Sequence, residues 1–193
     1  MVSDRRIVIG TLVLTLSLLA VPWLARGGEL SSAEGIAYYK KLTEQHPQKA
    51  SYWNALGYYY LKAGKLQEAE AHLLQAIETD GSYPTPHNNL GVVYLKQGHS
   101  ERAEGEFRQA VKLKPNYSKA QYNLAVALFH QRRYMDAARA YGKARELDND
   151  YVERRDNREN TKEKIEKALE QAAGDDKSTQ ELQRMKKWLA PHY

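Results

Sequence analysis

The chain has 193 residues, a formal net charge of +5 and no cysteine. The absence of cysteine excludes disulfides, thiolate metal sites, a cysteine nucleophile and the lipid-modified cysteine of a lipoprotein. Lysine and arginine are interleaved with aspartate and glutamate, and the chain shows no basic arm or nucleic-acid-binding motif. We therefore expect no nucleic acid among its partners.

The first segment, residues 1–28, is dominated by an apolar run. Ile7 to Ala25 carries no charge, and its 19 residues would form a helix of about 28 Å, close to the roughly 30 Å hydrocarbon core of a bilayer. This length favours a retained transmembrane anchor. The alternative is a cleaved signal peptide, for which Ala25 and Gly27 are the best cleavage-site residues.

The charges that flank the apolar run predict its orientation. Arg5 and Arg6 precede it, whereas Arg26 alone follows closely and Glu29 partly offsets that charge. The positive-inside rule then leaves the N-terminus in the cytoplasm. In a bacterium this predicts a single-pass protein of the inner (cytoplasmic) membrane with the rest of the chain in the periplasm. After cleavage the chain would be periplasmic.

Residues 29–49 predict a lone capping helix. Their sequence follows the register of the second half of the repeat that begins at residue 50, with Tyr39 at its aromatic position and Pro47 at its terminal position. Only the apolar N-terminus precedes this segment, so we expect it to cover the first repeat without a helical partner of its own.

A period of 34 residues organises residues 50–151 into the units 50–83, 84–117 and 118–151. Each unit holds two apolar patterns at helical spacing, separated by a turn. The small and large apolar positions that recur in register include Leu56, Leu90, Leu124, Ala69, Ala103, Ala137, Ala76, Ala110 and Ala144. A fixed period of this length is the signature of stacked helical hairpins, so an all-α fold is predicted.

Two further segments follow the repeats. Residues 152–173 are densely charged but keep an apolar stripe, which predicts a C-terminal capping helix with one dry face. Residues 174–193 predict a linker and a short amphipathic tail.

The repeat resembles the tetratricopeptide repeat, whose motif runs W-x2-L-G-x2-Y, then A-x3-F, A and P. The second unit matches this motif at Leu90, Gly91, Tyr94, Gly98, Ala103, Phe107, Ala110 and Pro115. The third unit diverges most, with Arg132 in place of the turn glycine and Asn149 in place of the proline. The resemblance implies an α-solenoid of three hairpins with flanking capping helices, which in this chain would follow an N-terminal transmembrane helix.

The resemblance also implies that the first helix of each hairpin lines a concave groove that binds a partner. The family's groove positions correspond here to Asn54, Tyr58, Leu61, Lys62, Asn88, Asn89, Val92, Leu95, Lys96, Lys119, Tyr122, Asn123, Val126, Phe129 and His130. Amides and cations suit the backbone and carboxylates of a peptide, and the apolar residues offer pockets. Asn89 and Asn123 are equally well explained as ordinary residues of the repeat.

Some relatives hold a C-terminal carboxylate with a clamp of two lysines, two asparagines and an arginine. Only Asn89 and Lys119 match that arrangement in this chain. We therefore do not expect a clamp for the tail of a chaperone.

The chain offers no constellation for catalysis. No two of its six histidines share a helix face at metal-ligand spacing, and no glycine-rich phosphate loop is present. We expect no enzyme activity, no cofactor and no metal site. The sequence predicts a membrane-tethered adaptor that holds a protein or peptide partner in an envelope, secretory or electron-transfer assembly. The alternatives are a soluble periplasmic co-chaperone, released by cleavage, and a self-assembling homo-oligomer.

Overall fold

A computed structural model of the chain describes residues 30–155, 177, 179–180 and 182–184. Residues 30–155 form α3 (Ser32–Gln45), α4 (Ala50–Lys62), α5 (Leu66–Thr79), α6 (Pro84–Lys96), α7 (Ser100–Leu113), α8 (Ser118–His130), α9 (Tyr134–Leu147) and α10 (Asn149–Arg155). The described part contains no strand, so the predicted all-helical class is confirmed there. The predicted anchor and most of the predicted capping helix and tail lie outside the described residues.

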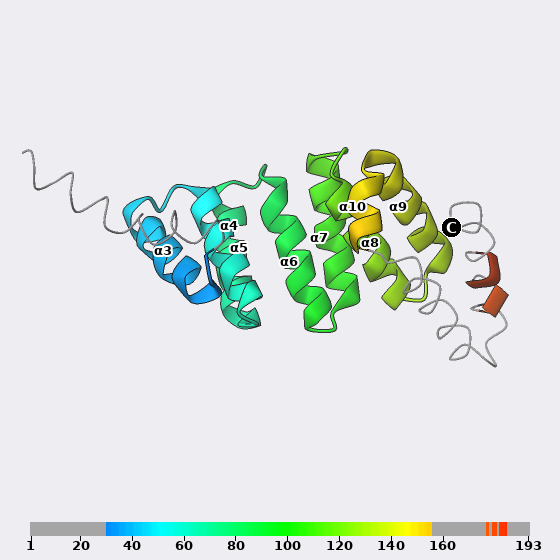
Figure 1. Cartoon of the computed structure of the whole chain (residues 1–193), viewed down its shortest axis with the longest axis horizontal. Coiled ribbons are helices and arrows are strands. Elements are labelled where there is room, and N and C mark those ends of the chain that lie inside the picture. The colour runs from blue at the N-terminus through cyan, green and yellow to red at the C-terminus, as the bar shows by residue number, and fades with distance from the viewer. Residues whose placement is uncertain (1–29, 156–176, 178, 181, 185–193) are drawn as a thin grey trace, which may run out of the picture.

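The helices form a row of hairpins in chain order (Figure 1). The first helix of each hairpin packs on the second, in the pairs α4–α5, α6–α7 and α8–α9, and successive hairpins join through α5–α6 and α7–α8. At one end α3 packs on α4, and at the other α10 packs on α9 and α8. The described helices thus build the three-hairpin solenoid with flanking helices. None of them has the length and apolar character that a membrane crossing requires.

Helix α3 is built to close the first end of the row. Ser31 and Glu34 form a capping box, in which each side chain accepts a hydrogen bond from the backbone N–H of the other. Gly35 is buried and lets the Tyr59 ring of α4 approach the α3 backbone. The Tyr39 ring stacks on Tyr59, with the ring centres 5.5 Å apart.

Small residues bring the two helices of a hairpin together. A Cβ at Gly91 would lie 2.5 Å from the Phe107 ring, and a Cβ at Gly57 would lie 2.7 Å from Cγ of Leu73. Phe107 and Leu73 are fully buried. A single cluster of buried apolar residues then runs through all three hairpins. The glycines therefore make the space that the large core side chains fill.

The turn inside each hairpin needs one residue with positive φ. Gly64 and Gly98 have φ angles of 75° and 84°, and Arg132 has 60° at the same position of the third hairpin. The turn closes the end of the first helix, since the Lys65 N–H donates to the Tyr60 carbonyl at 3.0 Å. A residue with a Cβ is strained here by roughly 1–2 kcal/mol, whereas glycine is not.

Gly98→Ala is expected to lower the free energy of unfolding by about 1 kcal/mol. The new Cβ would meet no atom within 4 Å, so the backbone strain acts alone. Arg132→Gly relieves the same strain and is expected to raise stability by up to about 1 kcal/mol. Urea unfolding followed by circular dichroism measures both variants. An unchanged midpoint for Gly98→Ala would show that this turn accepts a side chain.

Helix α10 begins at Asn149, whereas the repeat places the start of the C-terminal capping helix at residue 152. Asn149 occupies the position that Pro115 holds in the second unit. A carboxylate oxygen of Asp148 accepts the backbone N–H of Tyr151 at 2.8 Å. This is an N-terminal cap, and it explains why the helix starts earlier.

Candidate partner-binding face on the first helices

The first helices of the hairpins form one layer of the molecule. Helix α4 contacts α6, α6 contacts α8 and α8 contacts α10, whereas the second helices α5, α7 and α9 make at most sparse contacts with one another. The more closely packed layer of a helical stack lies on the inside of its curve. We call the solvent-facing surface of α4, α6 and α8 the first-helix face.

Apolar side chains form two rows across this face. Their members recur one period apart and are Tyr58, Val92 and Val126 in one row and Leu61, Leu95 and Phe129 in the other. Tyr58 is 38% exposed, and the other five are half-buried. Leu61, Val92, Leu95 and Phe129 also pack against the core. Packing against the core therefore holds these side chains in place, and their exposed parts form an apolar surface that a partner can reach.

The four asparagines predicted for the groove form one hydrogen-bonded chain. Asn123 donates to Asn88 at 2.9 Å, Asn88 donates to Asn89 at 3.3 Å, and Asn89 donates to Asn54 at 3.0 Å. All four are buried, and Asn88 has no exposed surface. Their amides thus bind one another and connect α4, α6 and α8. The bonds between helices join residues 35 apart, so a search at the period of 34 does not find them.

Cations stand at both ends of the first-helix face. Lys62 and Lys96 lie in the last turns of their helices, where the helix dipole favours positive charge, and His130 is the last residue of α8. Lys119 lies in the first turn of α8 and is half-buried. Burial, and then the positive charge of Arg155, lower the pKa of the Lys119 ammonium group. Lys119 is therefore held where its charge is poorly compensated.

Tyr122 marks the end of the face next to α9 and α10. Its ring centre lies 6.3 Å from that of Tyr141 and 6.0 Å from that of Tyr151. The half-buried Tyr122 thus belongs to an aromatic junction of three helices. Its ring contributes to packing at this end as well as to the surface.

The opposite layer contains inter-hairpin contacts that the sequence reading did not identify. Glu70 on α5 accepts hydrogen bonds from the Gln97 amide at 3.0 Å and the Arg102 guanidinium at 3.2 Å. The hydrogen bond from Gln97 is the main cause that lowers the pKa of Glu70. The equivalent residues one period later are Glu104 and Gln131. The two glutamates are 34 residues apart, and so are the two glutamines. This spacing was the signal in the sequence for a contact that recurs between hairpins.

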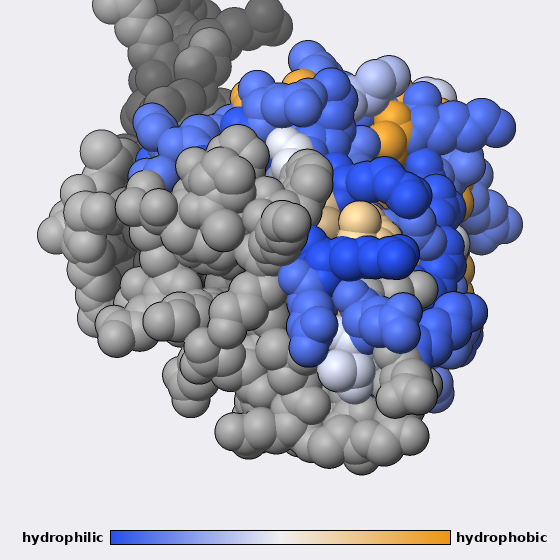
Figure 2. All heavy atoms as spheres, turned by 90° about the vertical axis from the view of Figure 1, so that its right-hand side faces the viewer, coloured by the Kyte–Doolittle hydropathy of each residue, from blue (hydrophilic) through white to orange (hydrophobic). Residues whose placement is uncertain are grey.

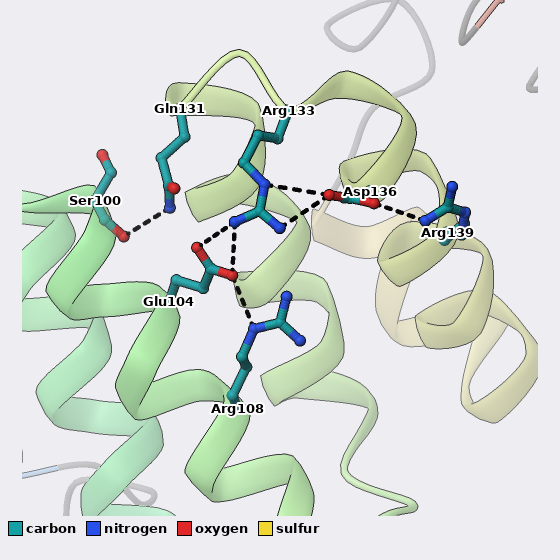
Figure 3. A network of polar contacts seen from close by, with 7 residues as sticks. All are labelled: Ser100, Glu104, Arg108, Gln131, Arg133, Asp136 and Arg139. Carbon is teal, nitrogen blue, oxygen red and sulfur yellow. Dashed lines mark hydrogen bonds and ion pairs between the residues drawn. The ribbon is translucent and has the colours of Figure 1, made fainter.

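Glu104 is the centre of the second of these contacts (Figure 3). Its carboxylate accepts from Arg108 at 2.8 Å and from Arg133 at 2.9 and 2.8 Å. Arg133 also binds Asp136, which in turn binds Arg139. Burial opposes ionisation of Glu104, but hydrogen bonds led by that from Arg108 outweigh it and lower its pKa. This network ties α7 to the turn that precedes α9.

The side of the molecule that carries α9 and α10 faces the viewer in Figure 2. The described atoms visible there are mostly hydrophilic, and apolar atoms show as small separate areas. Such a mixed surface is typical of the solvated end of a helical stack.

Among the described residues, no cluster of histidine, cysteine, aspartate and glutamate could hold a metal ion. The buried His87 has a structural partner instead, because its Nδ1 lies 2.7 Å from a carboxylate oxygen of Glu106. This pair joins α6 to α7.

Solved structures with the same fold are known. The structure of MamA has a TM-score of 0.59 at 22% identity and covers 73% of this chain and 81% of its own. The first TPR of Spaghetti (RPAP3), bound to the HSP90 peptide SRMEEVD, has a TM-score of 0.53 at 23% identity and covers 74% of this chain and 94% of its own. The second TPR of Spaghetti (RPAP3), bound to the same peptide, has a TM-score of 0.52 at 26% identity and covers 55% and 98%.

Family models match the repeats directly. Two models described as tetratricopeptide repeat match residues 88–151 and 38–71, and one described as TPR repeat matches residues 57–98. No curated protein matches the chain. The three models together span residues 38–151, more than half of the 193 residues. The chain therefore belongs to the tetratricopeptide repeat family.

Proposed function

We propose that this protein is a non-catalytic adaptor that binds a segment of a protein partner on its first-helix face. The observation that carries the proposal is the pair of apolar rows, which repeat on α4, α6 and α8 and stay partly exposed. Repeated, rigidly held apolar positions beside polar groups suit recognition of a peptide or a helix. Two of the structures that share the fold contain a bound HSP90 peptide.

We further propose that residues 1–28 tether the solenoid to the inner membrane, with the repeats on the periplasmic side. The uncharged run from Ile7 to Ala25 and the arginines before it support this arrangement. The partner would then belong to an envelope, secretory or electron-transfer assembly. N-terminal sequencing of the mature protein separates this proposal from a released periplasmic form.

Substitutions of apolar residues that reach solvent on the two layers test the proposed binding face. Tyr58→Asp combined with Val126→Asp places charge in one apolar row of the first-helix face. Leu74→Asp is the matched control, because Leu74 is 45% exposed on α5 in the opposite layer. Full-length tagged protein is isolated from detergent-solubilised native membranes, and the co-purified chains are quantified.

We expect the double variant to recover at least tenfold less partner than the wild type, since a buried charge at an apolar contact is strongly unfavourable. Leu74→Asp is expected to recover as much partner as the wild type. Equal recovery with the double variant would place the binding surface elsewhere on the molecule. Circular dichroism of each variant checks that the helices are retained.

A further inference from the structure

The two layers of the described solenoid differ in charge. Helices α4, α6 and α8 contain no aspartate or glutamate, and their full charges are Lys62, Lys96 and Lys119. The second helices carry the acidic residues Glu68, Glu70, Glu78, Glu101, Glu104, Glu106, Asp136 and Glu146. The first-helix layer is therefore purely cationic, apart from its histidines.

Four of the eight acidic residues of the second helices form ion pairs with arginine or lysine. These ion pairs are Glu70–Arg102, Glu104–Arg108, Glu104–Arg133, Asp136–Arg133, Asp136–Arg139 and Glu146–Lys143. In contrast, no ion pair of the described residues involves Lys96, Lys119 or Arg155. Among the described residues, the first-helix face thus carries Lys96 and Lys119 without an ion pair, and its own helices supply no carboxylate.

The positive charge of Lys119 does not stabilise its own helix, α8. A cation in the first turn of a helix opposes the helix dipole. Lys119 is also half-buried and lies near the positive charge of Arg155. Burial and a like charge both raise the free energy of the ammonium ion, and an external carboxylate between the two cations would lower it.

The spacing of the cations defines what would fit. Lys119 and His130 stand at opposite ends of α8, so the edge of the face that carries Lys119 and the edge at the helix ends, where Lys96 lies on α6, are about 16 Å apart at 1.5 Å per residue. Half-buried Val126 and Phe129 lie along the same helix, and Val92 and Leu95 lie on α6. An extended chain crosses this distance in about five residues.

We propose that the first-helix face binds a protein segment with an apolar middle and acidic residues on both sides of it. The apolar residues would pack on the two rows, and the carboxylates would meet Lys119 and Arg155 at one edge and Lys96 at the other. This inference rests on the proposed adaptor function and specifies its partner. The carboxylates belong to side chains within the bound segment, so binding does not need a free C-terminus.

Selection from a random 16-residue peptide library tests the inference. The peptides are displayed as N-terminal fusions, so that none presents a free C-terminus, and the target is the full-length protein in a non-ionic detergent. The charge-reversed variant is Lys96→Glu with Lys119→Glu. Its matched control is Lys112→Glu with Lys143→Glu, which makes the same change in net charge with exposed lysines of α7 and α9.

We expect the wild type and the control to enrich peptides with acidic residues around an apolar middle. The enriched peptide, synthesised with both ends blocked, is expected to bind the charge-reversed variant at least tenfold more weakly than the wild type. Its affinity should also fall as salt is raised. The variant should not unfold, because Lys119→Glu places a carboxylate at the N-terminus of α8 near Arg155. Its thermal midpoint is expected to equal or exceed that of the wild type.

Enriched peptides without an excess of acidic residues would overturn the inference, as would equal binding by the charge-reversed variant. If those peptides still lost binding with Tyr58→Asp and Val126→Asp, the adaptor function would stand without the acidic specificity. If no sequence were enriched above the library, both the inference and the adaptor function would be overturned.

Discussion

Replacing Phe107 with alanine is expected to lower the free energy of unfolding by about 3–5 kcal/mol. The Phe107 ring has no exposed surface and lies against the backbone of Gly91 on the partner helix of its hairpin. Its removal leaves a cavity in the middle of the row, between hairpins that pack on both sides. Since small domains have a total stability of about 5–15 kcal/mol, this single change should remove a large part of it. Urea unfolding of the full-length protein measures the effect.

The contact with Gly91 offers an internal check on this explanation. Gly91→Ala alone is expected to cost about 1–3 kcal/mol, because its Cβ would lie 2.5 Å from the Phe107 ring. In the Phe107→Ala background the same methyl group enters vacated space. The double variant should then lose clearly less stability than the sum of the single variants. Additive losses would show that the helix contact at Gly91 does not depend on the ring.

Replacing Asn88 with alanine is expected to cost about 2–3 kcal/mol. Asn88 is fully buried and stands in the middle of the asparagine chain, where it accepts from Asn123 and donates to Asn89. Its truncation leaves one donor and one acceptor without their partner in a site that water barely reaches. Asn116→Ala is the control, because Asn116 is an exposed residue of the turn before α8, and it should change stability by less than about 0.5 kcal/mol.

If Asn88→Ala and Asn116→Ala had the same free energy of unfolding, the structural role of the hydrogen-bonded asparagines would be contradicted. The prediction also bears on how binding experiments are designed. A variant of Asn54, Asn88, Asn89 or Asn123 disturbs the contacts between first helices, so a loss of binding would not identify a direct contact with the partner. Tyr58, Val126 and Lys96 are better probes, because they reach solvent without joining the asparagine chain.

Much of the fold was predictable because it depends on local spacing. The turn between the helices of a hairpin is one example: the motif places a turn glycine at residue 98, and Gly64, Gly98 and Arg132 all have positive φ at this position. Gly91 and Phe107 are another, because a small residue opposite a large one recurs at the same repeat positions. In both cases the partners lie within one unit, so the repeat pattern contains the information.

The candidate site was predictable only in part. Reading along the repeat identified which residues stand on the first helices, and the apolar rows followed from it. The pattern could not show that four polar residues of this surface bind one another, because those bonds depend on how neighbouring first helices are offset. It also missed the carboxylate contacts of Glu70 and Glu104, which join the second helix of one hairpin to residues of the next.

The sequence by itself determined the repeat, the order of the helices, the residues that turn the chain and which residues stand on the first helices, where we propose that a partner binds. Each of these depends on residues close together in the chain or one period apart. Only the tertiary structure decided which polar groups of that face are already satisfied. Packing of α4 on α6 and of α6 on α8 uses the asparagine amides internally, and packing of α10 on α8 brings Arg155 near Lys119. Hydrogen bonding and charge compensation between helices depend on distances that no repeat pattern contains.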